Sequence, residues 1–177
     1  LLFAPLFTAY ALYRYLYPEM FVAASRHLDV TLGTVNTLVL ITSSLTVAMA
    51  VHFARVGKNK MVIVMIALSL LAGFAFLGIK GVEYAHKFHE GALPGKYYAL
   101  KDLPDPSANM FFTIYFLATG VHAFHVVIGM GVLVWVAIRA AQNRISPEYY
   151  VPAELGGMYW HLVDLVWIFL YPLLYLI

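Results

Sequence analysis

Four long stretches of this chain carry almost no charge, and they constrain the fold more than any other feature. A helix needs about 20 mainly apolar residues to cross about 30 Å of hydrocarbon, and each stretch is long enough. Three contain no Asp, Glu, Lys or Arg, and the fourth contains only Asp164. Because a bilayer offers the backbone no hydrogen-bond partners, we expect each to be a membrane-spanning α-helix. The stretches are residues 30–54, 61–79, 106–138 and 155–177.

A fifth apolar run, residues 1–13, opens the chain. It has neither Met nor a basic segment at its start, so we interpret it as a truncated helix rather than a signal peptide. The expected fold class is therefore all-α: an integral membrane bundle of five transmembrane helices, the first truncated, in a single membrane domain of residues 1–177. The expected helices are approximately 1–17, 30–54, 61–83, 108–138 and 156–177, with a loop over 18–29.

Composition agrees with this fold and excludes several kinds of site. Apolar residues make up 63% of the chain and charged residues 11%, and the mean hydropathy of +0.81 lies outside the soluble range. The absence of cysteine excludes disulfides, thiolate zinc or iron–sulfur sites and thiolate copper centres. The chain has no phosphate-binding loop, nucleotide fingerprint or nucleic-acid motif, so we expect no nucleic-acid partner.

Basic residues indicate an orientation in the membrane. Cytoplasmic loops collect Lys and Arg, and the bias is strongest in short loops. Arg55, Lys58 and Lys60 stand together in the short link after the second expected helix. This favours an N-terminus inside and a C-terminus outside. We expect a multi-pass protein of the prokaryotic inner (plasma) membrane, with the mitochondrial inner membrane as the alternative.

Five ionisable side chains lie on the expected helices. Such groups are costly in hydrocarbon and mark functional sites or polar contacts inside a bundle. Glu83 can pair with Lys80, three residues earlier, or extend to the membrane interface. We expect these side chains to form an intramembrane polar network or to contact lipids and other subunits. They are Glu83, His122, His125, His161 and Asp164.

The histidines permit several interpretations. His122 and His125 share a helix face, as do His161 and Asp164, because each pair is three residues apart. His122 lies about 21 Å into its helix and His161 about 8 Å into its own, so they are not matched in depth for a bis-histidine haem. We favour interhelical hydrogen bonds over metal or haem ligation. His161 and Asp164 form either a self-satisfied pair or part of a proton relay. We expect no catalytic residue, metal site or cofactor site in this chain.

Two segments resemble motifs of subunit III of the haem–copper oxidases, the superfamily of cytochrome c and quinol oxidases. Residues 111–129 resemble the family's FF…TGxHGxHVxxG pattern, with Ala123 in place of the usual glycine. Residues 159–171 resemble its YWHFVDVVWLFLY segment. Together with weaker matches, these segments cover nearly the whole chain in the family's order. The weaker matches are Asn36-Thr37 with Ser43-Ser44, and Glu83-Tyr84.

The resemblance implies subunit III of a cytochrome c oxidase, in aerobic respiratory electron transport with O₂ reduction and proton pumping. Such a subunit holds no redox centre; haem and copper lie in its partners, oxidase subunits I and II. Bound phospholipid occupies a cleft between its helices. The implied role is to support assembly, lipid binding, proton uptake and sustained turnover.

Other functions stay open at this stage. Subunit III of a quinol oxidase and the accessory subunit of a nitric oxide reductase are close variants, which the partner's reaction would separate. A stand-alone proton-conducting or haem-binding membrane protein would use His122, His125, His161 and Asp164. A transporter would require a missing N-terminal half with inverted topology.

Overall fold

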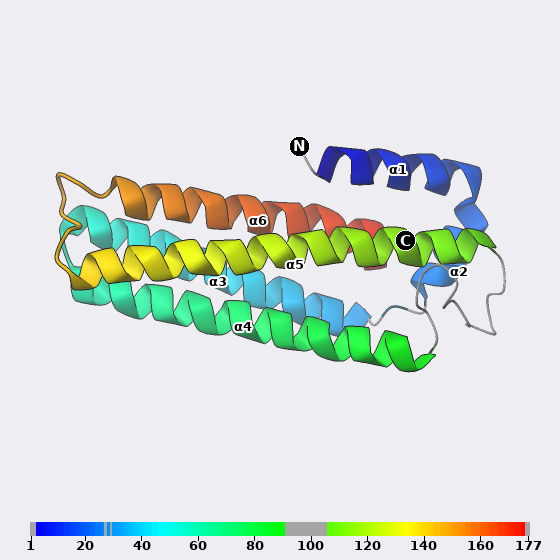
Figure 1. Ribbon diagram of the computed structural model, residues 1–177, viewed down its shortest axis with the longest axis horizontal. Helices are drawn as coiled ribbons and strands as arrows, with labels where there is room; N and C mark the ends of the chain where they lie inside the picture. Colours follow the sequence, from blue (N-terminus) through cyan, green and yellow to red (C-terminus); the bar gives the residue numbers. More distant parts are fainter. Residues whose placement is uncertain (1–2, 27, 29, 91–105, 176–177) are drawn as a thin grey trace. The chain divides into compact units, whose positions relative to one another are not determined.

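A computed structural model describes residues 3–26, 28, 30–90 and 106–175 of the chain. In these residues the secondary structure is α-helical and contains no strand beyond an isolated bridge between Ser146 and Tyr149. Figure 1 labels the helices in chain order. They are α1 (Phe3–Leu16), α2 (Pro18–Ser25), α3 (Val30–Val56), α4 (Asn59–Glu90), α5 (Pro106–Ala141) and α6 (Val151–Tyr175).

Four of the described helices are long and apolar enough to cross a membrane. The candidate spans are α3, α4 over Asn59–His89, α5 over Met110–Ala141, and α6. Helix α1 has 14 described residues and is not among them. The all-α fold is therefore confirmed, whereas the fifth transmembrane helix stays a prediction.

Several element bounds differ from the sequence expectations. The expected loop over 18–29 is wrong in its first part, because residues 18–25 form α2. Pro18 occupies the first helical position, where a missing N–H removes no intrahelical hydrogen bond and the ring fixes a helical φ. Helices α4 and α6 are also longer than expected, since α4 continues to Glu90 and α6 begins at Val151.

The chain divides into two compact units, and each of the four long helices contributes to both. The first unit contains α1, α2 and one end of each long helix, and the second contains the rest of those helices. The first unit comprises Leu1–Thr34, Ile79–Val121 and Phe169–Ile177, and the second comprises Val35–Gly78 and His122–Ile168.

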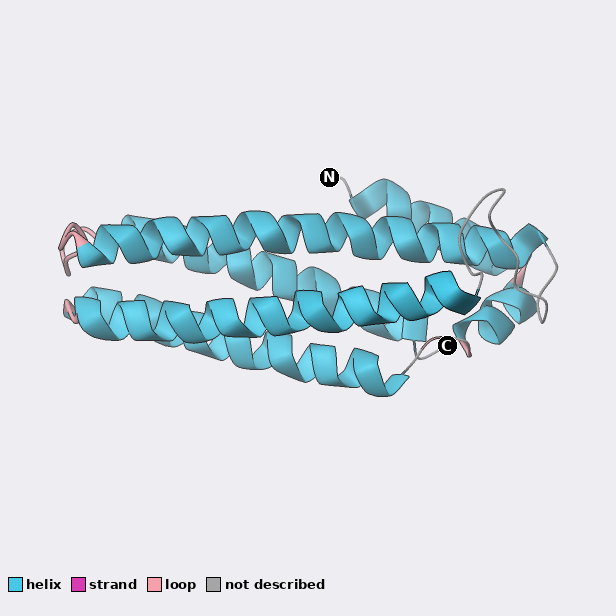
Figure 2. Ribbon diagram, turned by 60° about the horizontal axis from the view of Figure 1, so that its bottom comes forward, coloured by secondary structure: helices cyan, strands magenta, loops and turns pink. Residues whose placement is uncertain are grey.

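In the second unit, four helical segments run side by side (Figures 1 and 2). Their buried positions recur after three and four residues in alternation. Such 3.5-residue spacing forms a continuous seam on one helix face and is typical of left-handed helix packing. In α4 the buried seam of this unit consists of Val62, Ile66, Ser69, Gly73 and Phe76.

Trp160 of α6 contacts the other three helices of the second unit. Its indole Nε1 donates a 2.9 Å hydrogen bond to the hydroxyl of Ser43 on α3. Its ring lies against Gly73 of α4 and Gly129 of α5, where an added Cβ would come within 3.3 Å and 3.0 Å of ring carbons. Small residues allow membrane helices to approach closely. Two glycines therefore form the slot that holds this buried ring.

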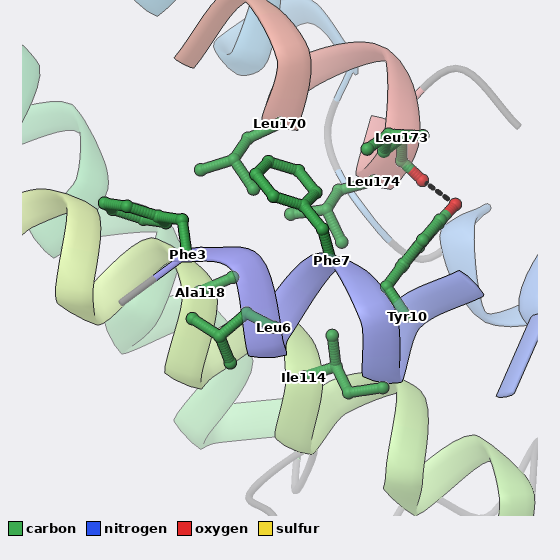
Figure 3. Close-up of a pocket in the computed structure, with 9 residues that line it drawn as sticks. All are labelled: Phe3, Leu6, Phe7, Tyr10, Ile114, Ala118, Leu170, Leu173 and Leu174. Carbon is green, nitrogen blue, oxygen red and sulfur yellow. Dashed lines mark hydrogen bonds between the residues drawn. The ribbon is translucent and has the colours of Figure 1, made fainter. Parts of the chain in front are cut away.

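In the first unit, α1 packs against α5 and α6. Figure 3 shows the Tyr10 hydroxyl donating to the backbone carbonyl of Leu173. Apolar side chains from all three helices enclose a cavity of about 10 Å³, which is at the lower limit of what a single water molecule needs. Its other lining residues are Phe3, Leu6, Phe7, Ile114, Ala118, Leu170 and Leu174.

Helix α2 is anchored in the same unit by Phe21. This side chain is fully buried, and its ring meets Tyr10 edge-on at 5.5 Å and Phe111 at 5.2 Å between centroids. Edge-to-face aromatic pairs add about 0.5–1.5 kcal/mol beyond the burial of their area. The segment expected to be a loop thus carries part of the aromatic core.

Substituting Gly129→Val should destabilise the protein, because the new side chain must enter the space of the Trp160 ring. Overpacking of this kind costs about 1–3 kcal/mol. Gly131→Val on the same helix is the matched control, since nothing lies within 4 Å of a Cβ at that position. Thermal unfolding in mild detergent measures both variants. Equal melting temperatures for the two would show that the glycine slot does not limit packing.

Candidate functional site

The buried seam of α4 changes from apolar to charged after Phe76. The same three–four spacing continues through Lys80, Glu83 and Lys87, and all three side chains are buried. A buried charge is costly unless it is paired and hydrogen-bonded. In the first unit, Lys80 and Glu83 meet this requirement through contacts with α5 and α6.

We call Lys80, Glu83, Tyr115 and Tyr175 the ion-pair cluster. Lys80 Nζ lies 3.3 Å from Glu83 Oε2 and donates a 2.6 Å hydrogen bond to the Tyr175 hydroxyl. Glu83 Oε1 accepts hydrogen bonds from the hydroxyls of Tyr115 at 2.8 Å and Tyr175 at 2.5 Å. Each carboxylate oxygen of Glu83 therefore has a donor, and the cluster joins α4, α5 and α6.

Three aromatic rings surround the Lys80 ammonium group. Nζ lies 5.1 Å from the ring centroid of Tyr175, 5.3 Å from that of Tyr115 and 6.0 Å from that of Tyr84. The Tyr84 hydroxyl is in turn hydrogen-bonded to Thr119 of α5. A cation over aromatic faces gains about 0.5–2 kcal/mol per contact, and more when desolvated. The rings thus replace part of the hydration that Lys80 loses.

The ion-pair cluster ties helices together and exposes no reactive group. Glu83 is 2% exposed, so the alternative in which it extends to the membrane interface is wrong. The structure brings Glu83 together with Lys80, the other partner that the sequence suggested. The remaining four expected site residues lie in the second unit.

His122 is fully buried among aromatic rings. Its imidazole stacks on Trp167 of α6, with centroids 5.3 Å apart and planes inclined by 28°, and meets Phe76 of α4 edge-on at 5.5 Å. The Trp167 indole donates a 3.0 Å hydrogen bond to Thr37 of α3. His122 is thus part of an interhelical aromatic core.

His125, one turn further along α5, has different surroundings. It is half-buried, and its backbone carbonyl accepts a 3.4 Å hydrogen bond from the Tyr159 hydroxyl. Across the described ranges, no three His, Cys, Asp or Glu side chains converge as metal ligands would. His122 and His125 share a helix face in sequence, but His122 is fully buried whereas His125 is only half-buried.

His161 and Asp164 do not form the direct pair that their spacing suggested. His161 Nδ1 is instead hydrogen-bonded to the hydroxyl of Ser44 on α3, at 2.6 Å. Asp164 is 4% exposed, and neither of its carboxylate oxygens has a hydrogen-bond partner of ordinary geometry among the described residues. Ser44 lies near enough to interact with this carboxyl group. The α3 hydroxyl, rather than the imidazole, is therefore its polar neighbour.

Sequence reasoning missed Tyr115 and Tyr175, which supply the hydroxyl donors to Glu83. It also ended the uncharged run at residue 79 and did not place Lys80 in a buried seam. The spacing of Phe76, Lys80 and Glu83 could have revealed this, because the charged residues continue the apolar pattern without interruption. The tyrosines themselves carry no such local signal, since they come from other helices.

The sequence of this chain is similar to those of known proteins. The family model described as cytochrome c oxidase subunit III matches residues 15–177. Cytochrome c oxidase subunit 3 of Arabidopsis thaliana is 34% identical over 140 residues, which are 79% of this chain and 47% of the relative. Quinol oxidase subunit 3 of Bacillus subtilis (strain 168) is 32% identical over 148 residues, 84% of this chain and 67% of the relative.

A vertebrate relative shows similar coverage. Cytochrome c oxidase subunit 3 of Gallus gallus is 31% identical over 140 residues, 79% of this chain and 48% of the relative. The chain therefore spans about half the length of the plant and chicken relatives that it matches.

Substituting Glu83→Gln should strongly destabilise the protein, because it leaves the Lys80 ammonium buried without a counter-charge. Breaking a buried ion pair from one side costs about 3–5 kcal/mol. Glu154→Gln is the matched control: it breaks the Arg55–Glu154 pair, whose side chains are 52% and 38% exposed. An exposed pair contributes about 0–1 kcal/mol.

Thermal unfolding in detergent measures both losses. The double variant Lys80→Met/Glu83→Gln should recover part of the stability lost in Glu83→Gln, because it removes the orphaned charge. If the double variant were less stable than Glu83→Gln by as much as Lys80→Met alone destabilises the protein, the two residues would act independently. That result would contradict the pairing.

Proposed function

This chain belongs to the cytochrome c oxidase subunit III family, and we propose that it is subunit III of a haem–copper terminal oxidase. In this role it serves aerobic respiratory electron transport, with O₂ reduction and proton pumping carried out by the complex. The haem and copper reside in partner subunits I and II. This chain supports assembly, lipid binding, proton uptake and sustained turnover.

The observation that carries the proposal is the family match over residues 15–177, which includes both C-terminal motif segments. The four candidate membrane spans support it, as does the nature of the polar contacts. Lys80, Glu83 and His161 bond to side chains of neighbouring helices. Contacts of this kind stabilise a scaffold, which is what an accessory subunit requires.

Exposed apolar side chains on the spans also support a membrane subunit. Examples are Leu45 on α3, Phe124 on α5 and Leu155 on α6, each more than half exposed. Large apolar surfaces mark contacts with membrane or with other proteins. We assign these surfaces to membrane lipid and to oxidase subunits I and II.

We further propose a prokaryotic inner membrane, with the N-terminus inside and the C-terminus outside. Arg55, Lys58 and Lys60 support this orientation, because they cluster around the short link between α3 and α4. The proposed sites are intramembrane polar contacts, or contacts with lipids and other subunits, that keep the subunit intact during turnover. They are Glu83 in the first unit, and His122, His125, His161 and Asp164 in the second.

Subunit III of a quinol oxidase is the second candidate. The Bacillus subtilis relative, a quinol oxidase subunit 3, matches 84% of this chain at an identity close to that of the cytochrome c oxidase relatives. The electron donor is a property of the partner subunits, so the two candidates assign the same role to this chain.

Purification of the chain from its native membrane in mild detergent, followed by mass spectrometry, tests the proposal. Haem–copper oxidase subunits I and II should co-purify at equal stoichiometry. Oxygen consumption with reduced cytochrome c or with a quinol then identifies the donor. A chain that purifies alone, or with a haem spectrum of its own, would contradict the assignment.

Substituting Asp164→Asn should shorten the turnover lifetime of the complex while leaving the initial oxidase rate nearly unchanged. The carboxyl group is buried beside Ser44 of α3, and we assign the redox centres to partner subunits, so the substitution changes a polar contact between helices rather than the redox chemistry. We expect a lifetime shorter by roughly fivefold, which corresponds to about 1 kcal/mol. Oxygen consumption followed to inactivation measures both quantities.

The control for this variant is Glu148→Gln, which removes an exposed carboxylate in the link between α5 and α6. It should leave both rate and lifetime unchanged. An immediate loss of electron transfer in an intact Asp164→Asn complex would contradict the structural role.

A further inference from the structure

Four tyrosine rings, which we call the tyrosine chain, lie in contact through the first unit. The Tyr171 and Tyr175 rings of α6 stack with centroids 5.5 Å apart. The Tyr175 ring meets that of Tyr115 on α5 at 6.3 Å, and the Tyr115 ring meets that of Tyr84 on α4 at 6.2 Å. We propose that the tyrosine chain relays single oxidising equivalents and that Tyr115 carries the radical. This redox function goes beyond the proposed function and needs no partner subunit.

The two ends of the tyrosine chain reach the protein surface, whereas its middle is buried. Tyr84 and Tyr171 are half-buried, and Tyr115 and Tyr175 are 0% and 3% exposed. A phenol ring loses an electron far more readily than an aliphatic side chain or a peptide group, and aromatic rings in contact exchange electrons quickly. An oxidant at the surface can therefore draw an electron from the buried rings without touching them.

Oxidation of a buried phenol requires a group that takes its proton. The Tyr115 hydroxyl donates a 2.8 Å hydrogen bond to the Glu83 Oε1 atom. A phenol that has lost an electron is a strong acid, and an ionised carboxylate is an acceptor, so the proton crosses this bond as the electron leaves. At Tyr115 the proton acceptor is therefore already in place, and the proton need not reach water.

Tyr175 donates to the same carboxylate oxygen, but its surroundings oppose oxidation. Its hydroxyl also accepts a 2.6 Å hydrogen bond from the Lys80 ammonium group, and a cationic donor withdraws electron density from the phenol oxygen. Among the described residues, the Tyr115 hydroxyl bonds to Glu83 and, at 3.4 Å, to the Tyr175 hydroxyl, and not to Lys80. The radical is therefore favoured on Tyr115.

The oxidant that we propose is a lipid alkoxyl radical at the surface near Tyr84. One electron passes from Tyr115 through Tyr84 to the alkoxyl radical, which takes a proton from interfacial water and becomes an alcohol. The Tyr115 O–H bond breaks, and an O–H bond forms on Glu83. A reductant of the quinol class then loses one electron and one proton. The electron returns to Tyr115, the proton replaces that taken from water, and Glu83 returns its own proton to Tyr115.

The oxidised state is transient because of Lys80. While Glu83 is protonated, the buried ammonium group has no carboxylate counter-charge, and such a group is costly. This cost raises the energy of the radical state and draws the proton back when an electron re-enters. Alkoxyl radicals are much stronger oxidants than phenoxyl radicals, so the step still proceeds. The tyrosine chain thus relays oxidising equivalents rather than storing them.

A photosensitiser attached beside Tyr84 tests the relay in the full chain, purified in mild detergent. The chain has no cysteine, so Ala85→Cys, at an exposed position, provides one attachment site for a ruthenium polypyridyl complex. A laser flash with an external electron acceptor produces Ru(III), a one-electron oxidant, at this site. Transient absorption should show a tyrosyl radical forming as Ru(III) is reduced. Its formation should be slower in deuterated water, because the proton moves with the electron.

Matched variants identify the residue that carries the radical. Tyr115→Phe keeps the ring but removes the hydroxyl, and it should abolish the tyrosyl signal. Tyr84 does not replace it, because its hydroxyl bonds to that of Thr119, which is a poor proton acceptor. Tyr149→Phe, at an exposed position in the link between α5 and α6, is the control and should leave the signal unchanged. Circular dichroism and thermal unfolding check that each variant is folded.

A second variant tests the proton acceptor without removing the counter-charge of Lys80. Glu83→Asp keeps the negative charge but draws it back from the Tyr115 hydroxyl, so the radical should form more slowly. It also serves if Tyr115→Phe does not fold.

Three results would overturn the proposal. They are the absence of a tyrosyl radical in the labelled parent chain, a radical that persists in Tyr115→Phe, and formation at the same rate in Glu83→Asp. Co-purification of oxidase subunits I and II is scored separately, so failure of the relay is distinguished from failure of the proposed function.

Discussion

The second unit depends on the burial of one indole ring. Trp160 fits only because α4 and α5 present Gly73 and Gly129 to it, and its N–H has a partner in Ser43 of α3. Helices in a membrane gain little from hydrophobic burial alone, because lipid tails are as apolar as leucine. Close packing and a satisfied polar atom must provide the attraction, and Trp160 provides both to three neighbouring helices at once.

The two units accommodate buried polar groups by different means. In the first unit, Lys80 and Glu83 are paired, hydrogen-bonded to tyrosines and surrounded by aromatic faces. In the second unit, His122 lies among aromatic rings and His161 bonds to Ser44. Each solution uses groups from at least two helices. A polar side chain in these spans thus specifies which helices must be neighbours, which agrees with the structural role that we propose.

The sequence predicted the existence of the long helices much better than the partners of their polar residues. Uncharged runs of span length can form little else in a bilayer, so α3, α4, α5 and α6 follow from local composition. The helix over residues 18–25 was not predicted because eight residues are too few for a clear periodic signal. Its stability comes instead from the packing of Phe21 on other helices. The pairing of His161 with Asp164 was wrong for a related reason, since shared helix spacing permits a contact but does not exclude a better one with Ser44.

By itself, the sequence determined that this chain is helical, apolar and without cysteine ligands, and its two C-terminal motifs indicated the family. These properties depend on composition and on short-range spacing, which are independent of how the helices meet. Only the tertiary structure decided that Tyr115 and Tyr175 donate to Glu83 and that glycines hold Trp160. Contacts of this kind join residues far apart in the chain, and their energy depends on geometry that no local pattern records.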